Sequence, residues 1–445
     1  MKTFSIGGIH PNDNKLAANS PIEQFPLGES VSISLSQHLG APAEPIVSKG
    51  ERVKCGQLIA KASGFISANI HSSVSGVVKS IAPHPDIIGN MVPHITIDVD
   101  SRQEWIDGVI ESNEILREIH LNPKEIIERI AEMGIVGLGG ASFPTHIKLS
   151  PPPGKKAHFL IINGAECEPY ITSDYRIMVE HPEEILIGAK IMMRALGVPK
   201  CIIGIEGNKR PAIEAIDGIA SLKYPQIKVV PLKTRYPQGG EKQLIEALLG
   251  REVPSMALPI DVGVVVQNVA TALSVYEAVQ KNRPLIENFI TVTGTSHSIQ
   301  KNLKVRVGTK IDSIIEKLEL PQEPLMKVIS GGPMMGKAIS RLEATTLKST
   351  SALLFLTAKE SKRGEESNCI RCSKCVEACP MGLEPYLLNK LARANRDEDL
   401  EENMVQDCIE CGSCSYVCPA NIPLLDTIRL SKSKILKLLR SRPKK

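Results

Sequence analysis

"CIRCSKCVEACP", residues 369–380, places four cysteines at the spacing C-x2-C-x2-C-x3-C and closes with a proline. The same spacing returns in "CIECGSCSYVCP", residues 408–419. Thiolates are soft ligands that suit iron–sulfur clusters, zinc or copper(I). In a duplicated pattern of this kind, three cysteines of each motif bind one cubane cluster and the fourth binds the other. The spacing therefore predicts that cluster one is held by Cys369, Cys372, Cys375 and Cys418, and cluster two by Cys408, Cys411, Cys414 and Cys379.

The alternative for these cysteines is a pair of structural zinc sites. Zinc motifs usually pair two separate C-x2–4-C elements, so four cysteines in one short run favour two 4Fe–4S clusters. Between the motifs, Leu387, Leu388 and Leu391 recur at helical spacing, which predicts a mostly helical two-cluster domain. Each such cluster carries one electron and performs no hydride chemistry. An enzyme built on them therefore needs a two-electron partner.

Length and composition narrow the class of protein. The 445 residues are enough for about three domains. Aromatic residues make up only 3% of the chain, which leaves few rings to stack on bases and argues against nucleic-acid binding. No apolar run is long enough to span a bilayer, and the first residues lack an export-signal pattern, so we expect a cytosolic chain. Cys55, Cys167 and Cys201 lie outside the two motifs and are expected to pack in cores.

The most informative segment upstream is "HLNPKEIIERIAEMGIVGLGGASFPTHIKL", residues 120–149. Asn122 followed by Pro123 predicts the start of a helix, and this helix runs into a glycine cluster within 134–140. Glycines there let backbone N–H groups approach a phosphate or a flat ring closely. From 158 to 279, apolar strands alternate with helical patterns, which predicts βαβ units in a parallel sheet.

This region resembles the flavin-bearing, NADH-binding subunit of respiratory complex I. The likeness rests on "GLGGASFPTHIK" (137–148), "NGAECEP" (163–169), "GGEK" (239–242) and "QNVAT" (267–271). It implies that FMN is held by Gly137, Gly139, Gly140, Lys148, Asn163, Asn268 and Thr271. It further implies that the surroundings of the flavin and the nicotinamide of NAD(H) are formed by Glu166, Glu168, Gly240 and Glu241, with Phe143 against the nucleotide ring.

Four positions depart from the complex I pattern. Leu138, Ala165, Lys242 and Gln267 stand where that family has arginine, aspartate, glutamate and asparagine. The chain also has two duplicated cluster motifs where the complex I protein has a single terminal cluster. These differences argue against a complex I subunit.

The two remaining parts of the chain resemble known accessory domains. In the first hundred residues, "KGERVKCGQLIA" (49–60) and "HSSVSGVV" (71–78) resemble a lipoyl or biotinyl carrier sandwich. No hairpin there offers a lysine for modification, so we expect a docking or lid domain. Residues 287–358 mix strands with one helix and resemble the β-grasp, soluble-ligand-binding insert of complex I relatives, with a scaffolding role.

The order of these modules, with "GGIHP", "QHLGAPAEP" and "GASFPTHIKL", closely resembles the RnfC family, the peripheral NADH-side subunits of Rnf electron-transport complexes. The likeness implies a multidomain α/β chain and an oxidoreductase subunit. It would transfer electrons between NAD(H) and ferredoxin through FMN and two 4Fe–4S clusters, coupled to ion translocation by partner subunits. The expected parts are a lipoyl-like barrel sandwich (1–110), a Rossmann-like FMN/NADH domain (116–285), a β-grasp domain (286–358), a ferredoxin-type two-cluster domain (359–430) and a basic tail (431–445).

The resemblance also implies partners and a location. The partners would be the other Rnf subunits in the membrane and the cluster-bearing RnfB subunit, with ferredoxin reached indirectly and no nucleic acid. The location would be peripheral, at the cytoplasmic face of the membrane. In the tail, four apolar residues lie among lysines and arginines: Ile435, Leu436, Leu438 and Leu439. They form either a short amphipathic patch that binds anionic lipid or acidic partners, or a solvated, frayed terminus.

Two other functions compete with this interpretation. A cobalamin-reducing flavoprotein of bacterial microcompartments uses related flavin, β-grasp and two-cluster modules, although the N-terminal position of the sandwich argues against it. The second alternative is a non-enzymatic electron-transfer subunit that has lost its flavin.

Overall fold

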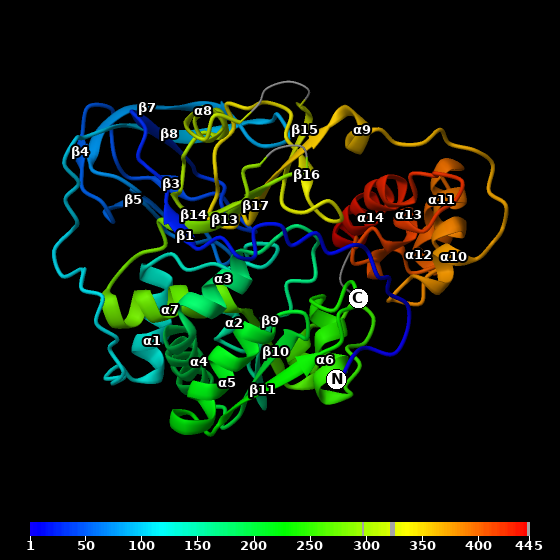
Figure 1. The fold of residues 1–445 in the computed structure, drawn as a ribbon, viewed down its shortest axis with the longest axis horizontal. Coiled ribbons are helices and arrows are strands. Elements are labelled where there is room, and N and C mark those ends of the chain that lie inside the picture. The colour runs from blue at the N-terminus through cyan, green and yellow to red at the C-terminus, as the bar shows by residue number, and fades with distance from the viewer. Residues whose placement is uncertain (296–297, 321–324, 443–445) are drawn as a thin grey trace.

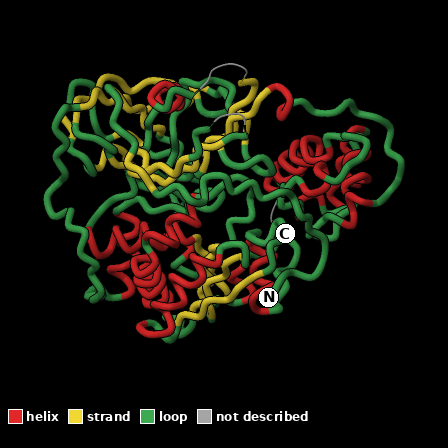
Figure 2. The backbone as a smooth tube through the Cα atoms, viewed as in Figure 1, coloured by secondary structure: helices red, strands yellow, loops and turns green. Residues whose placement is uncertain are grey.

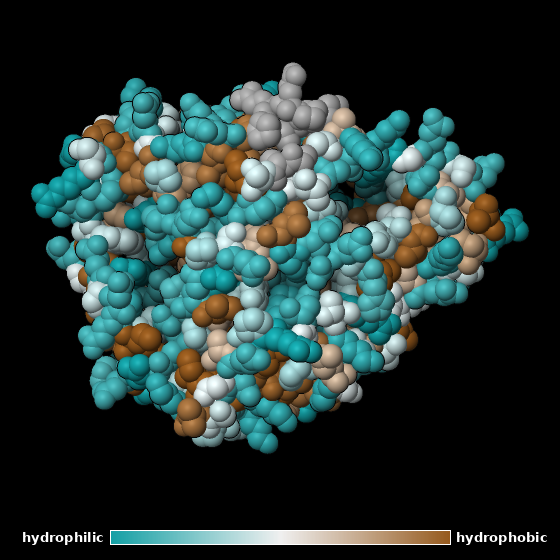
Figure 3. All heavy atoms as spheres, in the orientation of Figure 1, coloured by the Kyte–Doolittle hydropathy of each residue, from teal (hydrophilic) through white to brown (hydrophobic). Residues whose placement is uncertain are grey.

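The computed structural model describes residues 1–295, 298–320 and 325–442 (Figure 1). A group of β-sheets lies beside a helix-rich region, and a small helical module follows at the C-terminal end (Figure 2). The face seen in Figure 3 is mostly hydrophilic, with apolar residues scattered over it. No helix of the described residues is both long enough and apolar enough to cross a membrane.

The helix-rich region is built on a four-stranded parallel sheet with the strand order β11-β10-β9-β12. Buried side chains alternate along β9: Leu160 and Ile162 belong to one apolar core, and Ile161 belongs to another. This confirms the expected parallel arrangement of βαβ units. The elements are α1 (Pro123–Glu132), α2 (Thr145–Lys148), β9 (Phe159–Gly164), α3 (Ser173–Glu180), α4 (Pro182–Leu196), β10 (Cys201–Glu206), α5 (Arg210–Lys223), β11 (Ile227–Leu232), α6 (Glu241–Leu249), the 3-10 helix η1 (Pro259–Val262), β12 (Val264–Asn268) and α7 (Val269–Lys281).

The start of α1 follows the expectation from the sequence. The Asn122 side chain accepts hydrogen bonds from the backbone N–H groups of Lys124 and Glu125, at 3.0 and 3.1 Å. The Glu125 carboxylate in return accepts from the Asn122 N–H at 2.7 Å. This reciprocal capping satisfies N–H groups that the first helical turn leaves without partners.

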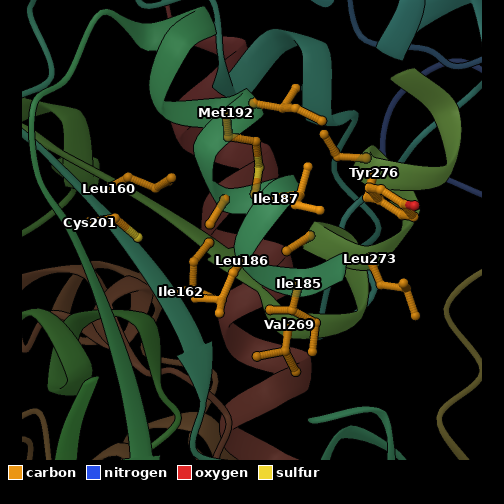
Figure 4. Packing of buried hydrophobic residues seen from close by; sticks show 14 of the residues in the cluster. Leu160, Ile162, Ile185, Leu186, Ile187, Met192, Cys201, Val269, Leu273 and Tyr276 are labelled. Carbon is orange, nitrogen blue, oxygen red and sulfur yellow. The ribbon is translucent and has the colours of Figure 1, made fainter. Parts of the chain in front are cut away.

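Helices α4 and α7 pack against each other in the larger core. Figure 4 shows Ile185 and Ile187 of α4 beside Val269 and Leu273 of α7. Gly188 lies at the contact, where a Cβ atom would overlap the backbone carbonyl oxygen of Ala272. The two helices therefore approach too closely for any larger residue at this position.

Replacing Gly188 by valine is expected to destabilise the protein by about 1–3 kcal/mol, because the helices must separate to admit the side chain. Thermal unfolding measures the loss. The matched control is Gly218→Val on α5, where an added Cβ meets no atom within 4 Å. Equal melting temperatures for the two variants would contradict the close contact.

The N-terminal sandwich consists of two small sheets. One has the order β2-β8-β7-β4 and the other the order β3-β5-β6. Their inward side chains, among them Val31, Ile33, Ile59 and Ile95, form one buried cluster. The strands are β2 (Ser30–Ser34), β3 (Glu44–Pro45), β4 (Arg52–Val53), β5 (Leu58–Lys61), β6 (Ile70–His71), β7 (Gly76–Pro85) and β8 (Met91–Val99).

A six-stranded mixed sheet lies next to the sandwich, in the order β1-β14-β13-β17-β15-β16. Helix α8 contributes Ile311, Ile314 and Ile315 to its core. The elements are β1 (Ile22–Gln24), β13 (Glu287–Thr293), β14 (Lys301–Arg306), α8 (Ile311–Lys317), β15 (Leu325–Ser330), β16 (Lys337–Ala338), β17 (Ala352–Thr357) and α9 (Ala358–Ser361).

Within the span 1–110 expected for the sandwich domain, the first 24 residues pair with strands outside the two sandwich sheets. Strand β1 pairs in parallel with β14 of the six-stranded sheet. Before it, Lys2 bridges to Leu232 on the edge strand β11, and Ile9 bridges to Tyr236. These pairings satisfy backbone N–H and C=O groups at the edges of sheets that are distant in sequence. The sequence of the first 24 residues alone does not indicate them.

The C-terminal module is mostly helical, as the leucine spacing predicted. Leu388 and Leu391 are buried in its core together with Leu400 and Val405. Its elements are α10 (Lys374–Glu377), α11 (Pro385–Arg393), α12 (Asp397–Glu402), the 3-10 helix η2 (Val405–Asp407), α13 (Ser413–Tyr416) and α14 (Leu424–Ser441).

A helix crosses the start of the basic tail expected at 431–445. Helix α14 runs without a break from Leu424 to Ser441, and Ile435 is only 1% exposed. Lys434 lies 2.5 Å from Asp397 and Arg442 pairs with Glu401, both on α12. Ile435 and part of the basic charge are therefore used within the chain, whereas Leu438 is exposed. Residues 443–445 lie outside the described part.

Candidate functional site

Two cavities in the C-terminal module are each lined by four cysteines. The first cavity is lined by Cys369, Cys372, Cys375 and Cys418. The second is lined by Cys379, Cys408, Cys411 and Cys414. The fourth cysteine of each motif thus lies with the three cysteines of the other motif, which is the grouping expected from the spacing. Among the described residues no three His, Cys, Asp or Glu side chains are grouped tightly enough to share one metal ion.

The two motifs fold in the same way. In each, the residues just before and just after the second cysteine have positive φ: Arg371 and Ser373 in the first motif, Glu410 and Gly412 in the second. This left-handed backbone winds the short loop around its cavity and leads directly into α10 or α13. The internal repeat in the sequence is therefore also a repeat of backbone conformation.

The two cavities differ in exposure. Cys369 and Cys372 of the first are exposed, whereas Cys379, Cys411 and Cys414 of the second are buried. Burial raises the pKa of the thiols in the second cavity, that of Cys408 to about 11. Buried thiols of this kind ionise when a cation binds beside them, which is the condition that iron supplies.

The second cavity adjoins the parallel-sheet region. The Tyr236 hydroxyl donates to the Cys411 carbonyl at 2.7 Å, and Gln243 Nε2 donates to the Pro380 carbonyl at 3.2 Å. The N-terminal segment passes between the two regions (Figure 1), with the Gly8 N–H 2.9 Å from the Ala378 carbonyl.

The glycine cluster and two asparagines meet at the carboxyl ends of β9 and β12. Asn163 and Asn268 are direct neighbours in the strand register. Asn163 Nδ2 donates to the Gly239 carbonyl at 2.9 Å. The Asn268 side chain caps α7 by accepting from the N–H groups of Ala270 and Thr271, at 2.7 and 3.3 Å. Parallel sheets bind ligands at this edge.

The glycine loop is fastened to the start of α7. Its two ends join through the Gly137 N–H and the Phe143 carbonyl at 2.9 Å, and the Leu138 N–H donates to Thr271 Oγ1 at 3.0 Å. A Cβ atom on Gly139 would lie 2.8 Å from Asn268 Nδ2, so the backbone approaches the asparagine as only glycine permits. A Cβ atom on Gly140 would meet no atom within 4 Å, so the loop is open on that side.

Lys148 reaches the same edge from α2. Its amine lies 2.8 Å from Glu241 Oε1 and 3.2 Å from the Val266 carbonyl. Gly240 precedes Glu241, the first residue of α6. Nine of the twelve residues predicted around the flavin therefore lie in three adjoining segments. These segments are the glycine loop with α2, the end of β12 with α7, and the start of α6. Asn163 of β9 lies at the same edge.

The carboxylates of Glu166 and Glu168 both have backbone partners. The Glu166 carboxylate accepts from the Asp174 N–H at 2.7 Å, at the start of α3. The Glu168 carboxylate accepts from the N–H groups of Met334 and Met335, at 2.6 and 2.9 Å. Both carboxylates thus hold protein backbone in this structure. Segments that come together only in the folded chain supply these donors.

A buried polar network missed from the sequence extends behind the asparagines. Asn268 Nδ2 donates to Asp174 Oδ2 at 2.6 Å, and burial raises the pKa of Asp174 to about 6. The Lys15 amine donates to the carbonyls of Glu166, Glu168 and Ile171 at 2.7–2.9 Å. No motif marks Lys15 or Asp174, so only the fold identifies them.

Comparison with known proteins identifies the family. Residues 2–102 match the RnfC barrel sandwich hybrid domain, 130–277 the Nuo51 FMN-binding domain and 361–419 the 4Fe-4S dicluster domain. The component designated C of the proton-translocating ferredoxin:NAD(+) oxidoreductase complex of Clostridium ljungdahlii is 46% identical over 403 residues, covering 90% of this chain and 87% of that protein. The chain belongs to the RnfC family.

Other members of the RnfC family match over nearly the whole chain. The corresponding component of the Na(+)-translocating complex of Acetobacterium woodii is 42% identical, covering 97% of this chain and 96% of that protein. That of the ion-translocating oxidoreductase complex of Rhodobacter capsulatus is 44% identical, covering 98% and 84%. An NAD+-reducing [NiFe]-hydrogenase in the H2-reduced state shares the fold at a TM-score of 0.50 and 18% identity, over 73% of this chain and 64% of that one.

FMN and 4Fe–4S clusters are accordingly the cofactors of this member of the RnfC family. The residues at the sheet edge fit a polar ligand such as FMN. Gln238, in the loop that precedes α6, is fully buried, and neither polar atom of its amide has a hydrogen-bond partner among the described residues. Nε2 of Gln267, 3% exposed on β12, also lacks one in the described part of the chain. These atoms leave hydrogen-bonding capacity at residues next in sequence to Gly239 and Asn268.

Proposed function

We propose that this chain is the component of an ion-translocating ferredoxin:NAD+ oxidoreductase complex that exchanges electrons with NAD(H). The electrons pass between NAD(H) and ferredoxin by way of FMN and two 4Fe–4S clusters, and partner subunits couple the transfer to ion movement. Membership of the RnfC family supports this function.

The observation that carries the proposal is a single short segment that contacts both candidate sites. In residues 236–243, the Gly239 carbonyl bonds to Asn163 and the Glu241 carboxylate to Lys148 at the sheet edge. In the same segment, Tyr236 bonds to the backbone of Cys411 and Gln243 to that of Pro380 beside the second cavity. This one segment therefore connects the sheet edge, where a flavin would bind, to the cavity that would hold cluster two.

The cysteines lining each cavity are proposed as the iron ligands of one cluster. Cluster one takes Cys369, Cys372, Cys375 and Cys418, and cluster two takes Cys379, Cys408, Cys411 and Cys414. FMN is proposed to lie against the glycine loop, Phe143 and the ends of β9 and β12. The residues holding it are Gly137, Gly139, Gly140, Lys148, Asn163, Gly240, Glu241, Asn268 and Thr271.

When bound, FMN supplies the exchange between the electron pair of a hydride and single electrons. The chain supplies position and charge. The open side of the loop at Gly140 would let a flat ring or a phosphate approach, and the Lys148 amine, beside Glu241, would offset negative charge on the phosphate. Asn268 holds the loop against α7 through its cap and its contact with Gly139.

The order of the clusters follows from their positions. Cys379, Cys408, Cys411 and Cys414, in the cavity that adjoins the parallel-sheet region, would hold the cluster that exchanges electrons with the flavin. Cys369 and Cys372 are exposed, so the cluster that they would hold with Cys375 and Cys418 would be open to a partner protein of the complex. In this order cluster two would lie between the flavin and cluster one, and cluster one between cluster two and the partner protein.

The remaining assignments belong to the same proposal. Residues 286–358 form a β-grasp domain that acts as a scaffold, residues 116–285 the FMN/NADH domain and residues 359–430 the body of the two-cluster domain. The partners are the other proteins of the complex, among them the cluster-bearing RnfB subunit, and ferredoxin is reached through them. The chain works at the cytoplasmic face of the membrane.

Anaerobic reconstitution of the purified chain tests the function. We expect about eight irons and about one FMN per chain, and bleaching of the iron–sulfur absorbance when NADH is added. Material with eight irons and bound FMN that stays coloured with excess NADH would contradict the proposal. Full iron without any flavin would favour the electron-transfer protein that lacks FMN, and NADH-dependent corrinoid reduction would favour the cobalamin reductase.

A further inference from the structure

Two adjacent residues from outside the FMN domain form hydrogen bonds on both sides of the glycine loop proposed to hold FMN. The loop is taken here as the stretch from Gly134 to Ser142. At the far end, the Ser142 hydroxyl lies 2.5 Å from the hydroxyl of Ser349. At the near end, the Lys348 amine donates to the Gly134 carbonyl at 2.7 Å. Lys348 and Ser349 are neighbours in the segment that leads into β17, so a single backbone unit fixes the distance between the two ends of the loop.

Ser142 is held in a conformation that needs such support. It has φ 53°, in the left-handed region that serine seldom adopts, and it is 9% exposed. Its carbonyl accepts from the Leu39 N–H of the sandwich at 3.3 Å. The side-chain contact to Ser349 and the backbone contact to Leu39 therefore both hold the end of the loop from outside its own domain.

Lys348 joins three parts of the fold. It is 1% exposed, and its amine also donates to the Asn69 carbonyl of the sandwich at 2.8 Å, while its N–H donates to Gln37 Oε1 at 3.0 Å. Gly134, with φ 62°, lets the chain pass this close, because a Cβ there would lie 2.9 Å from the Lys348 amine. A buried amine is costly unless its hydrogens are accepted, and both acceptors lie at or beside the loop.

Among the described residues, no carboxylate forms an ion pair with this amine, and burial lowers the pKa of Lys348 to about 7. Burial, and after it the charge of Lys348, lowers the pKa of His38 and His71 in the sandwich, that of His71 to about 3. The contacts that hold the loop are therefore hydrogen bonds to carbonyls and a hydroxyl.

We propose that Lys348 and Ser349 are positioning residues for the FMN site, which hold the glycine loop in its binding conformation by fixing Gly134 and Ser142. The barrel sandwich completes this clamp through Asn69, Gln37 and Leu39, which assigns it a role in shaping the cofactor site. The inference rests on the proposed function, because it takes FMN as the ligand of the loop.

The test measures FMN affinity on the full chain with its clusters in place and its flavin removed, by quenching of FMN fluorescence. Lys348→Met is expected to weaken FMN binding by about tenfold or more, and Ser349→Ala by about threefold to tenfold. Amide hydrogen exchange within 134–143 is expected to speed up in both variants, which a merely structural role elsewhere would not cause.

Two matched controls separate the clamp from general damage. Lys281→Met removes another buried lysine amine, which donates to the Ser112 carbonyl at 2.9 Å near the far end of α7. Ser73→Ala removes another hydroxyl that joins the sandwich to the six-stranded sheet region, at 2.6 Å from the Val307 carbonyl. Both controls are expected to bind FMN within about twofold of the unchanged chain.

The outcomes distinguish the clamp from the proposed function. If the unchanged chain does not bind FMN, the proposed function fails and the clamp fails with it. If the unchanged chain binds FMN and Ser349→Ala, folded and with full iron, binds equally well with unchanged loop exchange, the clamp alone is overturned. Ser349→Ala decides the matter where Lys348→Met does not fold.

Discussion

Replacing Cys411 by alanine is expected to remove cluster two and to stop electrons from NADH before they reach cluster one. Iron content would fall from about eight to about four per chain, and the remaining cluster would stay oxidised when NADH reduces the flavin. The physical reason is the position of the second cavity, which adjoins the parallel-sheet region through Tyr236 and Gln243. Absorbance and electron paramagnetic resonance after addition of NADH measure the effect.

The matched variant is Cys372→Ala in the exposed cavity. It also lowers iron to about four per chain, but the remaining cluster two would still be reduced by NADH, because it lies next to the flavin. Cys201→Ala, which changes a buried cysteine in β10, is the control that keeps all the iron. Reduction of the remaining cluster in both cluster variants, or in neither, would contradict the order proposed for the two clusters.

Replacing Gly139 by valine is expected to empty the flavin site while leaving both clusters in place. A Cβ at this position would lie 2.8 Å from Asn268 Nδ2. The asparagine has little freedom to move, because its side chain both caps α7 and bonds to Asp174. Overpacking of this kind costs about 1–3 kcal/mol, or roughly a tenfold to hundredfold loss of FMN affinity if the loop shifts to relieve it.

Flavin and iron content of the purified variant measure this result together. About eight irons with little FMN is the expected outcome, accompanied by loss of NADH-dependent bleaching. Gly218→Val on α5 is the control, since its side chain would enter open space. A Gly139→Val protein that retains FMN at the affinity of the unchanged chain would show that the flavin does not depend on this loop.

Local spacing was enough to predict several parts of the structure. The spacing of the cysteines predicted that Cys379 groups with the second motif and Cys418 with the first, and the cysteines lining the two cavities have this grouping. Asn122 before Pro123 predicted the start of α1 because a helix cap is formed by residues three positions apart. The resemblance to the complex I flavin subunit grouped the glycine loop with Asn163 and Asn268, and these two asparagines are neighbours at one edge of the parallel sheet.

Contacts between distant segments could not be predicted from local patterns. Glu166 and Glu168 follow a strand as a ligand-binding pair would, and their carboxylates also accept from backbone N–H groups at 174 and 334–335. The basic end of the chain has the pattern of a surface patch, yet Ile435 packs inward and Lys434 pairs with Asp397. In each case the partner lies too far along the chain for any local pattern to include it.

By itself, the sequence determined the metal chemistry and the parallel βαβ arrangement, because cysteine spacing and the alternation of strands with helices are local patterns; the flavin residues were predicted through a family resemblance. Only the tertiary structure decided which cavity adjoins the flavin domain, and only it brought Lys348 and Ser349 to the two ends of the glycine loop. Those features depend on how separately folded segments pack. That packing is determined over the whole molecule, by the burial of apolar side chains and by the need of buried polar groups for hydrogen-bond partners.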